Sequence, residues 1–315
     1  MSEHVRLLRS VGRSAWLWIP GPPDPPAWFD QTVPVLVSPT LELEEDDLLV
    51  LPEVPVVPGV DPAPGARTVI LNQNHFYTYA AGSPSAWVAY PGWSRVPAVW
   101  TVSRESRDVL RALHPDLDVA LIPNPVATDL FTPRPSATPS VAWFSRKRPR
   151  EATVLHRLLS NDERMRGVVL HDITDEPWPS VAEILGQATV FVALGHTEGF
   201  GLPLAEALAA GCLVAGYDGG GGHELFGAPG AWRVPEQRPL LLAELVADLV
   251  TRRADLLRAA ADNRSWIRAR YGPGNTLSAL LPAVEAALAT PGASAVAVHP
   301  ARWLDQVPPG FHLAG

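Results

Sequence analysis

Cysteine is nearly absent from this chain of 315 residues, which contains only Cys212. A single thiol cannot close an intramolecular disulfide, so a disulfide-stapled secreted domain is excluded and a reducing compartment is favoured. The sequence has no run of roughly 18 apolar residues, the length needed to span a membrane. At the N-terminus, Arg6, Arg9 and Arg13 interrupt what would be the apolar core of a secretory leader. We therefore expect a cytoplasmic protein without a transmembrane segment.

Positive charge is also scarce, since the formal net charge is −8 at pH 7. Nucleic-acid binding needs a basic surface that meets the phosphates, so we expect no nucleic-acid partner. A cluster of His, Cys and Asp residues at the spacing of metal ligands is missing as well. The sequence therefore predicts neither a metal site nor a cofactor.

The length of the chain exceeds what one hydrophobic core usually holds, which predicts two domains. We expect the first at 1–130, where short apolar runs bounded by Pro, Gly and Asp are typical of buried parallel strands. These runs are Ala15–Ile19, Val33–Val37, Leu48–Leu51, Thr68–Leu71, Ala98–Val102 and Val119–Ile122. A helix is predicted at Ser103–Leu113, with Ser103 as its N-cap.

In the second predicted domain, 131–290, strands alternate with helices, which indicates βαβ units and a doubly wound parallel sheet. The predicted strands are Val141–Phe144, Val168–His171, Val190–Leu194, Leu213–Tyr217 and Ala231–Val234. The predicted helices are 150–160, 179–186, 203–210 and a long stretch 239–290 that is broken near 271–274. Phe131–Ser140, with three prolines, is the predicted hinge between the domains. For 291–315 two interpretations stay open: a tail that returns to the first domain, or a poorly ordered one.

The most informative segment is GHTEGFGLPLAEALAAG, which follows the predicted strand Val190–Leu194. A glycine-containing turn leads to a helix that begins at Pro203, a residue favoured in the first helical position, and stops at Gly211. Free backbone N–H groups and the positive end of the helix dipole make such a turn a binding site for phosphate. Glu198 lies on the turn and Glu206 on the helix, and carboxylates suit paired sugar hydroxyls.

With these residues the sequence resembles the retaining glycosyltransferases of family 4, which have the GT-B fold. The resemblance implies two Rossmann-like, doubly wound α/β domains that face each other across a cleft. It implies that Glu198 contacts the donor sugar and that Glu206 holds the ribose of the nucleotide. The turn Gly199–Phe200–Gly201–Leu202 would touch sugar and phosphate through its backbone. The alternatives are a solvated turn residue for Glu198 and, for Glu206, a carboxylate that merely favours a helix N-terminus.

Four basic residues lie in five positions after the strand Val141–Phe144, namely Arg146, Lys147, Arg148 and Arg150. In the enzymes that the chain resembles, an Arg and a Lys at this place clamp the donor diphosphate and stabilise the leaving group. The resemblance favours Arg146 first, Lys147 second and Arg150 in reserve. The alternative is a solvated basic loop.

Two further segments resemble parts of the same enzymes. The loop Asp218–Glu224 contains four consecutive glycines, and the resemblance gives Gly221 and Gly222 a supporting role beside the sugar and phosphates. A plain flexible loop is the alternative. In the first domain, Asn72–Gln73–Asn74–His75 follows a predicted strand. His75 or Asn74 would touch the donor sugar or the acceptor, and the alternative is a histidine bonded within the core or to a helix cap.

The resemblance implies a retaining, metal-independent glycosyltransferase of the hexosyltransferase type (EC 2.4). The sugar would pass from a nucleotide-diphosphate sugar to a hydroxyl of a small-molecule, lipid or saccharide acceptor. An Asp-x-Asp, as metal-dependent transferases require, occurs at 116–118, in a predicted surface loop away from the donor segment. Two rivals remain: a nucleotide-sugar hydrolase or epimerase of the same fold, and a non-catalytic GT-B partner subunit. The oligomeric state stays open.

Overall fold

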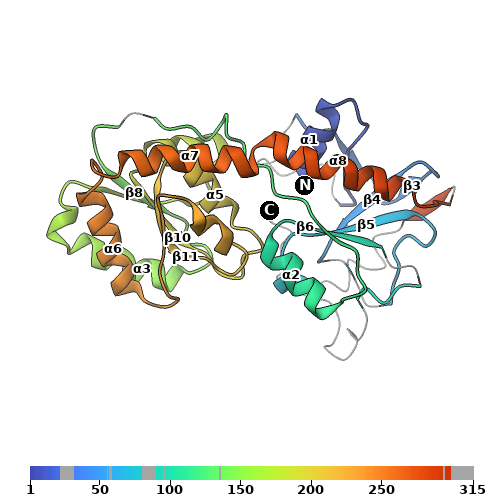
Figure 1. Cartoon of the computed structure of the whole chain (residues 1–315), viewed down its shortest axis with the longest axis horizontal. Coiled ribbons are helices and arrows are strands. Elements are labelled where there is room, and N and C mark those ends of the chain that lie inside the picture. The colour runs from blue at the N-terminus through green and yellow to red at the C-terminus, as the bar shows by residue number, and fades with distance from the viewer. Residues whose placement is uncertain are drawn as a thin grey trace. The chain divides into compact units, whose positions relative to one another are not determined.

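The computed structural model describes residues 1–21, 32–54, 56, 59–79, 90–94, 97–134, 136–293 and 295–298. The chain divides into two compact units (Figure 1). The first unit comprises Met1–Pro123 together with the residues from Thr276 onward, and the second comprises Asn124–Asn275. Helix α8 (Pro273–Leu288) starts in the second unit and continues into the first.

The first unit is built on a sheet of four parallel strands in the order β4-β5-β6-β7. Their bounds are Leu48–Pro52, Arg67–Asn72, Ala98–Thr101 and Val119–Leu121. A separate pair of parallel strands joins β1 (Leu17–Ile19) to β2 (Val35–Val37). All six strands lie within the predicted apolar runs or extend them by one residue at an end. The strands of the four-stranded sheet are largely buried, whereas Leu36 and Val37 of β2 are exposed.

Two elements of the first unit come from the ends of its sequence. Helix α1 (Ser2–Ser10), which the sequence analysis did not predict, buries His4, Val5 and Leu7. Strand β13 (Val296–Val298) pairs antiparallel with β3 (Leu41–Leu43). This part of the predicted tail thus returns to the first unit, and the rest of the tail lies outside the described residues.

Helix α2 (Arg104–Leu113) begins where its capping sequence predicts. The Ser103 hydroxyl accepts a hydrogen bond from the Ser106 N–H at 3.1 Å, which satisfies one of the free amides of the first turn. The 3₁₀ helix η1 (His75–Tyr77) follows β5 directly. Both short elements therefore lie at the carboxyl ends of strands of the four-stranded sheet.

The second unit contains a sheet of five parallel strands in the order β9-β8-β10-β11-β12. The strands, in chain order from β8, are Ser140–Trp143, Val169–Asp172, Val190–Leu194, Leu213–Tyr217 and Ala231–Arg233. In this numbering the order is 2-1-3-4-5, one of the two common doubly wound arrangements. The prediction of a doubly wound parallel sheet is confirmed.

Helices cover both faces of this sheet (Figure 1). Helices α3 (Pro149–Ser160) and α6 (Pro239–Thr251) pack together against Val190, Val192 and Leu194 on one face. Helices α4 (Trp178–Gln187), α5 (Leu202–Ala209) and α7 (Leu257–Tyr271) cover the other. Side chains of β10 alternate between two apolar layers, which is why the strand is buried along its whole length.

The long helical stretch predicted for 239–290 is three helices, α6, α7 and α8. The predicted break near 271–274 is confirmed, but a second break at 252–256 was not predicted. The second break carries no Gly or Pro that would have indicated it. In the described part of the chain, no helix combines the length and apolar content of a membrane span.

Candidate active site

The sheet of the second unit reverses its strand order between β8 and β10. Strand β9 lies on the far side of β8, whereas β11 and β12 follow on the far side of β10. The loops after β8 and β10 therefore leave the sheet in opposite directions at its carboxyl edge, and doubly wound folds bind ligands in the crevice between such loops. The predicted residues Arg146 and Lys147 follow β8, and Glu198 follows β10.

An ion pair connects these two loops. The Lys147 Nζ atom lies 2.8 Å from Glu198 Oε1, and it also donates a hydrogen bond to the His196 carbonyl oxygen at 3.4 Å. The two side chains are 28% and 17% exposed, so both charges are partly desolvated but still reach water. The structure thus brings together two residues 51 positions apart that the sequence analysis had assigned to one site.

Lys147 is the only lysine in the chain, because 24 of the 25 Lys and Arg residues are arginines. An ammonium is a compact point charge on a flexible stem, whereas a guanidinium is a planar fork of donors. The ion pair with Glu198 uses this lysine, and the preference for Arg146 before Lys147 as the donor contact stays a prediction. Arg146 itself is exposed and has no hydrogen bond or ion pair with any described residue.

The neighbouring Arg148 forms hydrogen bonds and ion pairs within the protein. Its side chain is 10% exposed and ties three loops together. Its Nε donates to the Gly195 carbonyl oxygen at 3.0 Å, its Nη1 lies 3.1 Å from Glu151 Oε2, and it forms an ion pair with Glu236. The guanidinium lies 5.0 Å from the centre of the Tyr217 ring, whose hydroxyl donates to Glu151 at 2.6 Å. Arg148 therefore connects the loop after β8 to the loops after β10 and β12.

Helix α5 follows β10 at the same edge of the sheet. Its N-cap, Gly201, has φ of +88°, a left-handed conformation that a residue with a Cβ rarely adopts. The amides of the first turn have no acceptor within the helix, and they are the donors that suit an anion. The Phe200 side chain is buried and its ring centre lies 5.1 Å from that of Tyr271, so Phe200 anchors the turn. Leu202 is exposed.

The four-glycine loop packs on the turn that carries Glu198. The Glu198 amide donates to the Gly219 carbonyl oxygen at 2.8 Å, and the Gly221 amide donates to the Glu198 carbonyl oxygen at 2.9 Å. A Cβ on Gly221 would lie 2.1 Å from the Gly199 carbonyl oxygen, and one on Gly222 would lie 2.5 Å from a backbone oxygen. Close backbone packing thus explains why glycine occupies positions 221 and 222. Ligand contact by Gly221 and Gly222 stays a prediction.

Glu206 lies on α5 with 9% of its surface exposed. Its Oε1 accepts a hydrogen bond from the Trp178 indole N–H at 3.1 Å. Burial raises the pKa of the Glu206 carboxyl to about 7, and the Trp178 hydrogen bond opposes that shift. Trp178 was missed by the sequence analysis, because nothing in its local sequence indicates a contact with a residue 28 positions away.

His75 belongs to the first unit, whereas the other predicted site residues belong to the second. Its Nδ1 lies 3.0 Å from the Ser106 hydroxyl, which also accepts a hydrogen bond from the Ser103 hydroxyl at 3.0 Å. Burial lowers the pKa of His75, and the nearby Glu105 carboxylate opposes that shift. One ring nitrogen is therefore engaged at the cap of α2, as the alternative interpretation predicted. A ligand contact through the other nitrogen stays a prediction.

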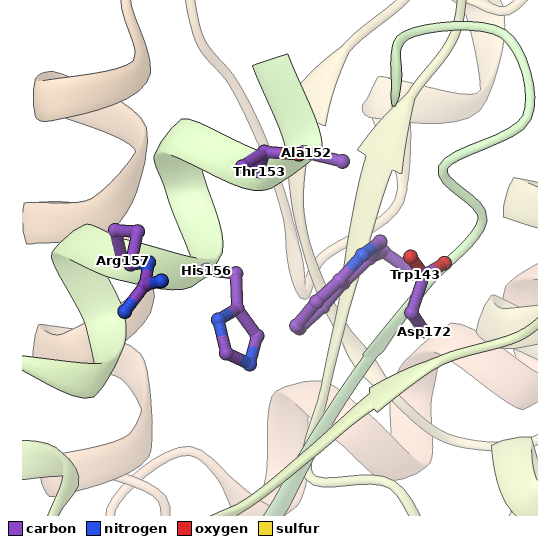
Figure 2. A pocket seen from close by; sticks show the side chains of 6 residues that line it. All are labelled: Trp143, Ala152, Thr153, His156, Arg157 and Asp172. Atoms are coloured by element: carbon purple, nitrogen blue, oxygen red, sulfur yellow. The ribbon is translucent and has the colours of Figure 1, made fainter. Parts of the chain in front are cut away.

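A separate pocket of about 350 Å³ lies beside α3 (Figure 2). Figure 2 shows the His156 ring turned toward Trp143, the last residue of β8, and their ring centres are 6.0 Å apart. The pocket contains none of the predicted site residues. Among the described residues, no group of three or more His, Cys, Asp or Glu side chains is arranged to hold a metal ion.

Comparison with known proteins adds to this geometry. Residues 173–266 match the model of the family Glycosyl transferases group 1. This range contains Trp178, Glu198 and Glu206, and Lys147 precedes it. The chain is also 27% identical over 232 residues to the alpha-1,6-glucosyltransferase of Actinobacillus pleuropneumoniae serotype 7 (strain AP76). The alignment covers 69% of this chain and 67% of that relative. Both findings support a glycosyltransferase.

Solved structures confirm the fold. Sucrose-phosphate synthase from Thermosynechococcus elongatus superposes with a TM-score of 0.56 at 16% identity, over 70% of this chain and 67% of that one. The Anabaena protein HepE, in complex with UDP, has a TM-score of 0.54 at 14% identity, over 70% and 72%. At these identities the likeness concerns the fold alone, which is the GT-B fold of two Rossmann-like α/β units.

Proposed function

We propose that the chain transfers a sugar from a nucleotide-diphosphate sugar to an acceptor hydroxyl, with retention of anomeric configuration and without a metal ion. The observation that carries the proposal is the Lys147–Glu198 pair at the point where the strand order reverses. A cation, a carboxylate and the start of α5 meet there. Together they offer donors for a diphosphate and an acceptor for sugar hydroxyls.

In this mechanism the donor separates the ion pair and binds to both of its members. The diphosphate takes over the Lys147 ammonium, and Glu198 is released to accept hydrogen bonds from the sugar. Arg146 and the amides at the start of α5 add positive charge around the phosphates. These groups stabilise the charge that develops on the leaving diphosphate, which is the main electrostatic demand of the reaction.

Glycosyl transfer then needs one bond to break and one to form at the same carbon. The bond from the anomeric carbon to the diphosphate oxygen breaks, and the oxygen leaves with the electron pair. The acceptor oxygen bonds to the anomeric carbon from the same face, and its proton passes to the leaving phosphate oxygen. No protein base is required, and Lys147 supplies the charge that a divalent cation supplies elsewhere.

Thermal unfolding with a panel of nucleotides tests the donor site. The panel is UDP, GDP, ADP, dTDP and CMP, each with and without magnesium, and UDP comes first because it is bound in the similar Anabaena structure. A nucleotide at a hundred times its Kd adds about 2.7 kcal/mol of stability, which is a shift of several degrees. We expect one nucleotide to shift the melting temperature equally with and without magnesium. Absence of any shift would contradict the proposal.

The single lysine allows a second test at residue level. Acetylation of the folded protein with an amine-reactive ester targets amines, and Lys147 carries the only side-chain amine of the chain. We expect the selected nucleotide diphosphate to protect Lys147, whereas a nucleotide that gives no thermal shift leaves its labelling unchanged, as measured by peptide mass spectrometry. Equal labelling of Lys147 with and without nucleotide would place the diphosphate elsewhere.

Product analysis separates transfer from its rivals. We expect little release of free sugar when the donor sugar is supplied without an acceptor. Rapid release or isomerisation of the sugar would favour the nucleotide-sugar hydrolase or epimerase. Nucleotide binding without turnover over a broad panel of small-molecule, lipid and saccharide acceptors would favour the non-catalytic partner subunit.

A further inference from the structure

The carboxylate of Glu206 is held by one side chain from a different helix. Trp178, the first residue of α4, donates its indole N–H to Glu206 Oε1 at 3.1 Å. The other oxygen, Oε2, has no partner among the described residues. One oxygen is thus engaged within the protein, and the second is available to a ligand.

Trp178 is itself fixed in place. It lies between Pro177 and Pro179 at the start of α4, where both prolines limit the backbone. Its ring stands edge-on to the ring of Phe131, with centres 5.7 Å apart and planes at 65°. Phe131 is fully buried. The Trp178 side chain is 36% exposed, and the contact with Phe131 and the hydrogen bond to Glu206 fix the orientation of its ring, which has only two torsions.

The segment that contains Phe131 also fixes α4 to α5. The Arg134 amide donates to the Gly186 carbonyl oxygen of α4 at 2.7 Å. A Cβ on Gly211, which follows α5, would lie 2.9 Å from the Pro133 ring. This start of the predicted hinge is therefore packed within the second unit. It holds the two helices that carry Trp178 and Glu206 in register.

A rigid donor matters because a glutamate side chain is flexible. Fixing a Glu side chain in one conformation costs rotamer entropy. Because the Glu206 side chain is already ordered in the folded protein, a ligand that bonds to Oε2 loses none of its binding free energy to ordering that side chain. Supporting hydrogen bonds of this kind decide whether a site is held in its productive geometry.

We propose that Trp178 is a positioning residue that orients Glu206 so that its free oxygen accepts a ribose hydroxyl of the donor nucleotide. The inference rests on the proposed function, because it needs a nucleotide in the site. It makes Trp178 a determinant of the preference for a ribonucleotide over a nucleotide without ribose hydroxyls. A site built to accept a hydroxyl discriminates strongly against the analogue that lacks it.

The test compares UDP with 2′,3′-dideoxyuridine diphosphate by titration calorimetry on the full chain. If the nucleotide panel selects another base, the corresponding pair replaces them. Trp178→Phe keeps an aromatic ring and removes the N–H donor. Trp232→Phe, in β12, is the matched control, because it makes the same change at a partly buried tryptophan away from Glu206.

We expect Trp178→Phe to weaken UDP binding about tenfold, the effect of losing one hydrogen bond to a charged group. Binding of the dideoxy analogue should change less than twofold, so the preference for ribose shrinks. Trp232→Phe should leave both affinities unchanged. Melting curves of both variants establish that they fold. If Trp178→Phe does not fold, benzothienylalanine at position 178 keeps the shape of tryptophan and still lacks the N–H.

Three outcomes would overturn the inference. Equal weakening of UDP and the dideoxy analogue would mean that Trp178 contacts the base or only supports the fold. Unchanged affinities would mean that Glu206 is oriented without it. Failure of the wild-type protein to bind any nucleotide would remove the proposed function as well, and this result is distinct from the other two.

Discussion

At the scale of single residues, the ion pair between Lys147 and Glu198 is only partly buried. Both side chains remain partly in contact with water. An ion pair of this exposure contributes less than about 1 kcal/mol to stability. A ligand can therefore separate the two side chains at low cost, as the proposed donor with its diphosphate and sugar would require.

Substitution of the two partners should have opposite effects on binding. Lys147→Gln should weaken nucleoside diphosphate binding about tenfold or more, because a charge-assisted contact is lost. Glu198→Gln should leave binding unchanged or tighter, since the ammonium is no longer engaged, while transfer falls at least about a hundredfold. Calorimetry and a transfer assay measure the two effects. Arg166→Gln, at a side chain 79% exposed, is the charge-matched control.

The buried carboxyl of Glu206 predicts a dependence of stability on pH. Its pKa is raised from 4.5 to about 7 in the folded protein, so the folded state binds the proton more tightly than the unfolded state. The penalty of the buried charge is absent below pH 4.5 and grows until about pH 7. We expect Glu206→Gln to become more stable relative to wild type by about 2–3 kcal/mol over this window. A constant difference from pH 4.5 to 7 would contradict the assignment.

This comparison isolates one carboxyl. Burial also raises the pKa of Glu53 in the first unit to about 7, and that group shifts the stability of both proteins in the same direction. The difference between variant and wild type cancels it. Denaturant unfolding at several pH values gives the free energies directly.

At the scale of elements, the turn after β10 depends on the glycine loop after β11. The loop lies against the backbone of the turn, and its amides and carbonyls exchange hydrogen bonds with Glu198. Side chains would hold the two backbones apart. The position of Glu198 is therefore decided by a segment more than twenty residues further along the chain.

Gly221→Ala should displace this turn. Its methyl group would lie 2.1 Å from the Gly199 carbonyl oxygen, and backbone cannot yield as a flexible side chain does. We expect a loss of nucleotide binding together with a lower melting temperature. Gly274→Ala is the control, because nothing lies within 4 Å of its added methyl group and alanine favours a helix. Normal nucleotide binding by Gly221→Ala would show that the loop does not hold the turn.

At the scale of the whole molecule, the proposed donor is an anion, whereas the chain has a net charge of −8. The overall field would repel that donor, so attraction has to come from charges close to the site. In the proposed mechanism these charges are Lys147, Arg146 and the start of α5. They are concentrated in the second unit, at one edge of one sheet.

Metal removal tests whether these charges suffice. We expect the protein to bind nucleotide and transfer sugar at an unchanged rate after treatment with EDTA and exchange into metal-free buffer. Addition of magnesium afterwards should change the rate less than twofold. A rate that collapses with EDTA and returns with magnesium would require a bound cation beside the diphosphate, and the metal-independent mechanism would be wrong.

Much of the fold could be predicted from local patterns. Strand β10 and helix α5 follow from an apolar run, a glycine turn and a helix-starting proline, all read from neighbouring residues. Helix α1 and the break after α6 were missed, because α1 has no side-chain N-cap and the break has no Gly or Pro. Their existence depends on packing against distant parts of each unit, which local periodicity does not contain.

By itself, the sequence determined the composition, the elements and the paired glutamates, because each of these depends on residues close together in the chain. Only the tertiary structure decided which partners those residues meet. It formed the ion pair between Lys147 and Glu198, the hydrogen bond from Arg148 to Gly195, and the hydrogen bond from Trp178 to Glu206. Such contacts arise when a parallel sheet brings the ends of separate strands to one edge, and their geometry is a property of packing.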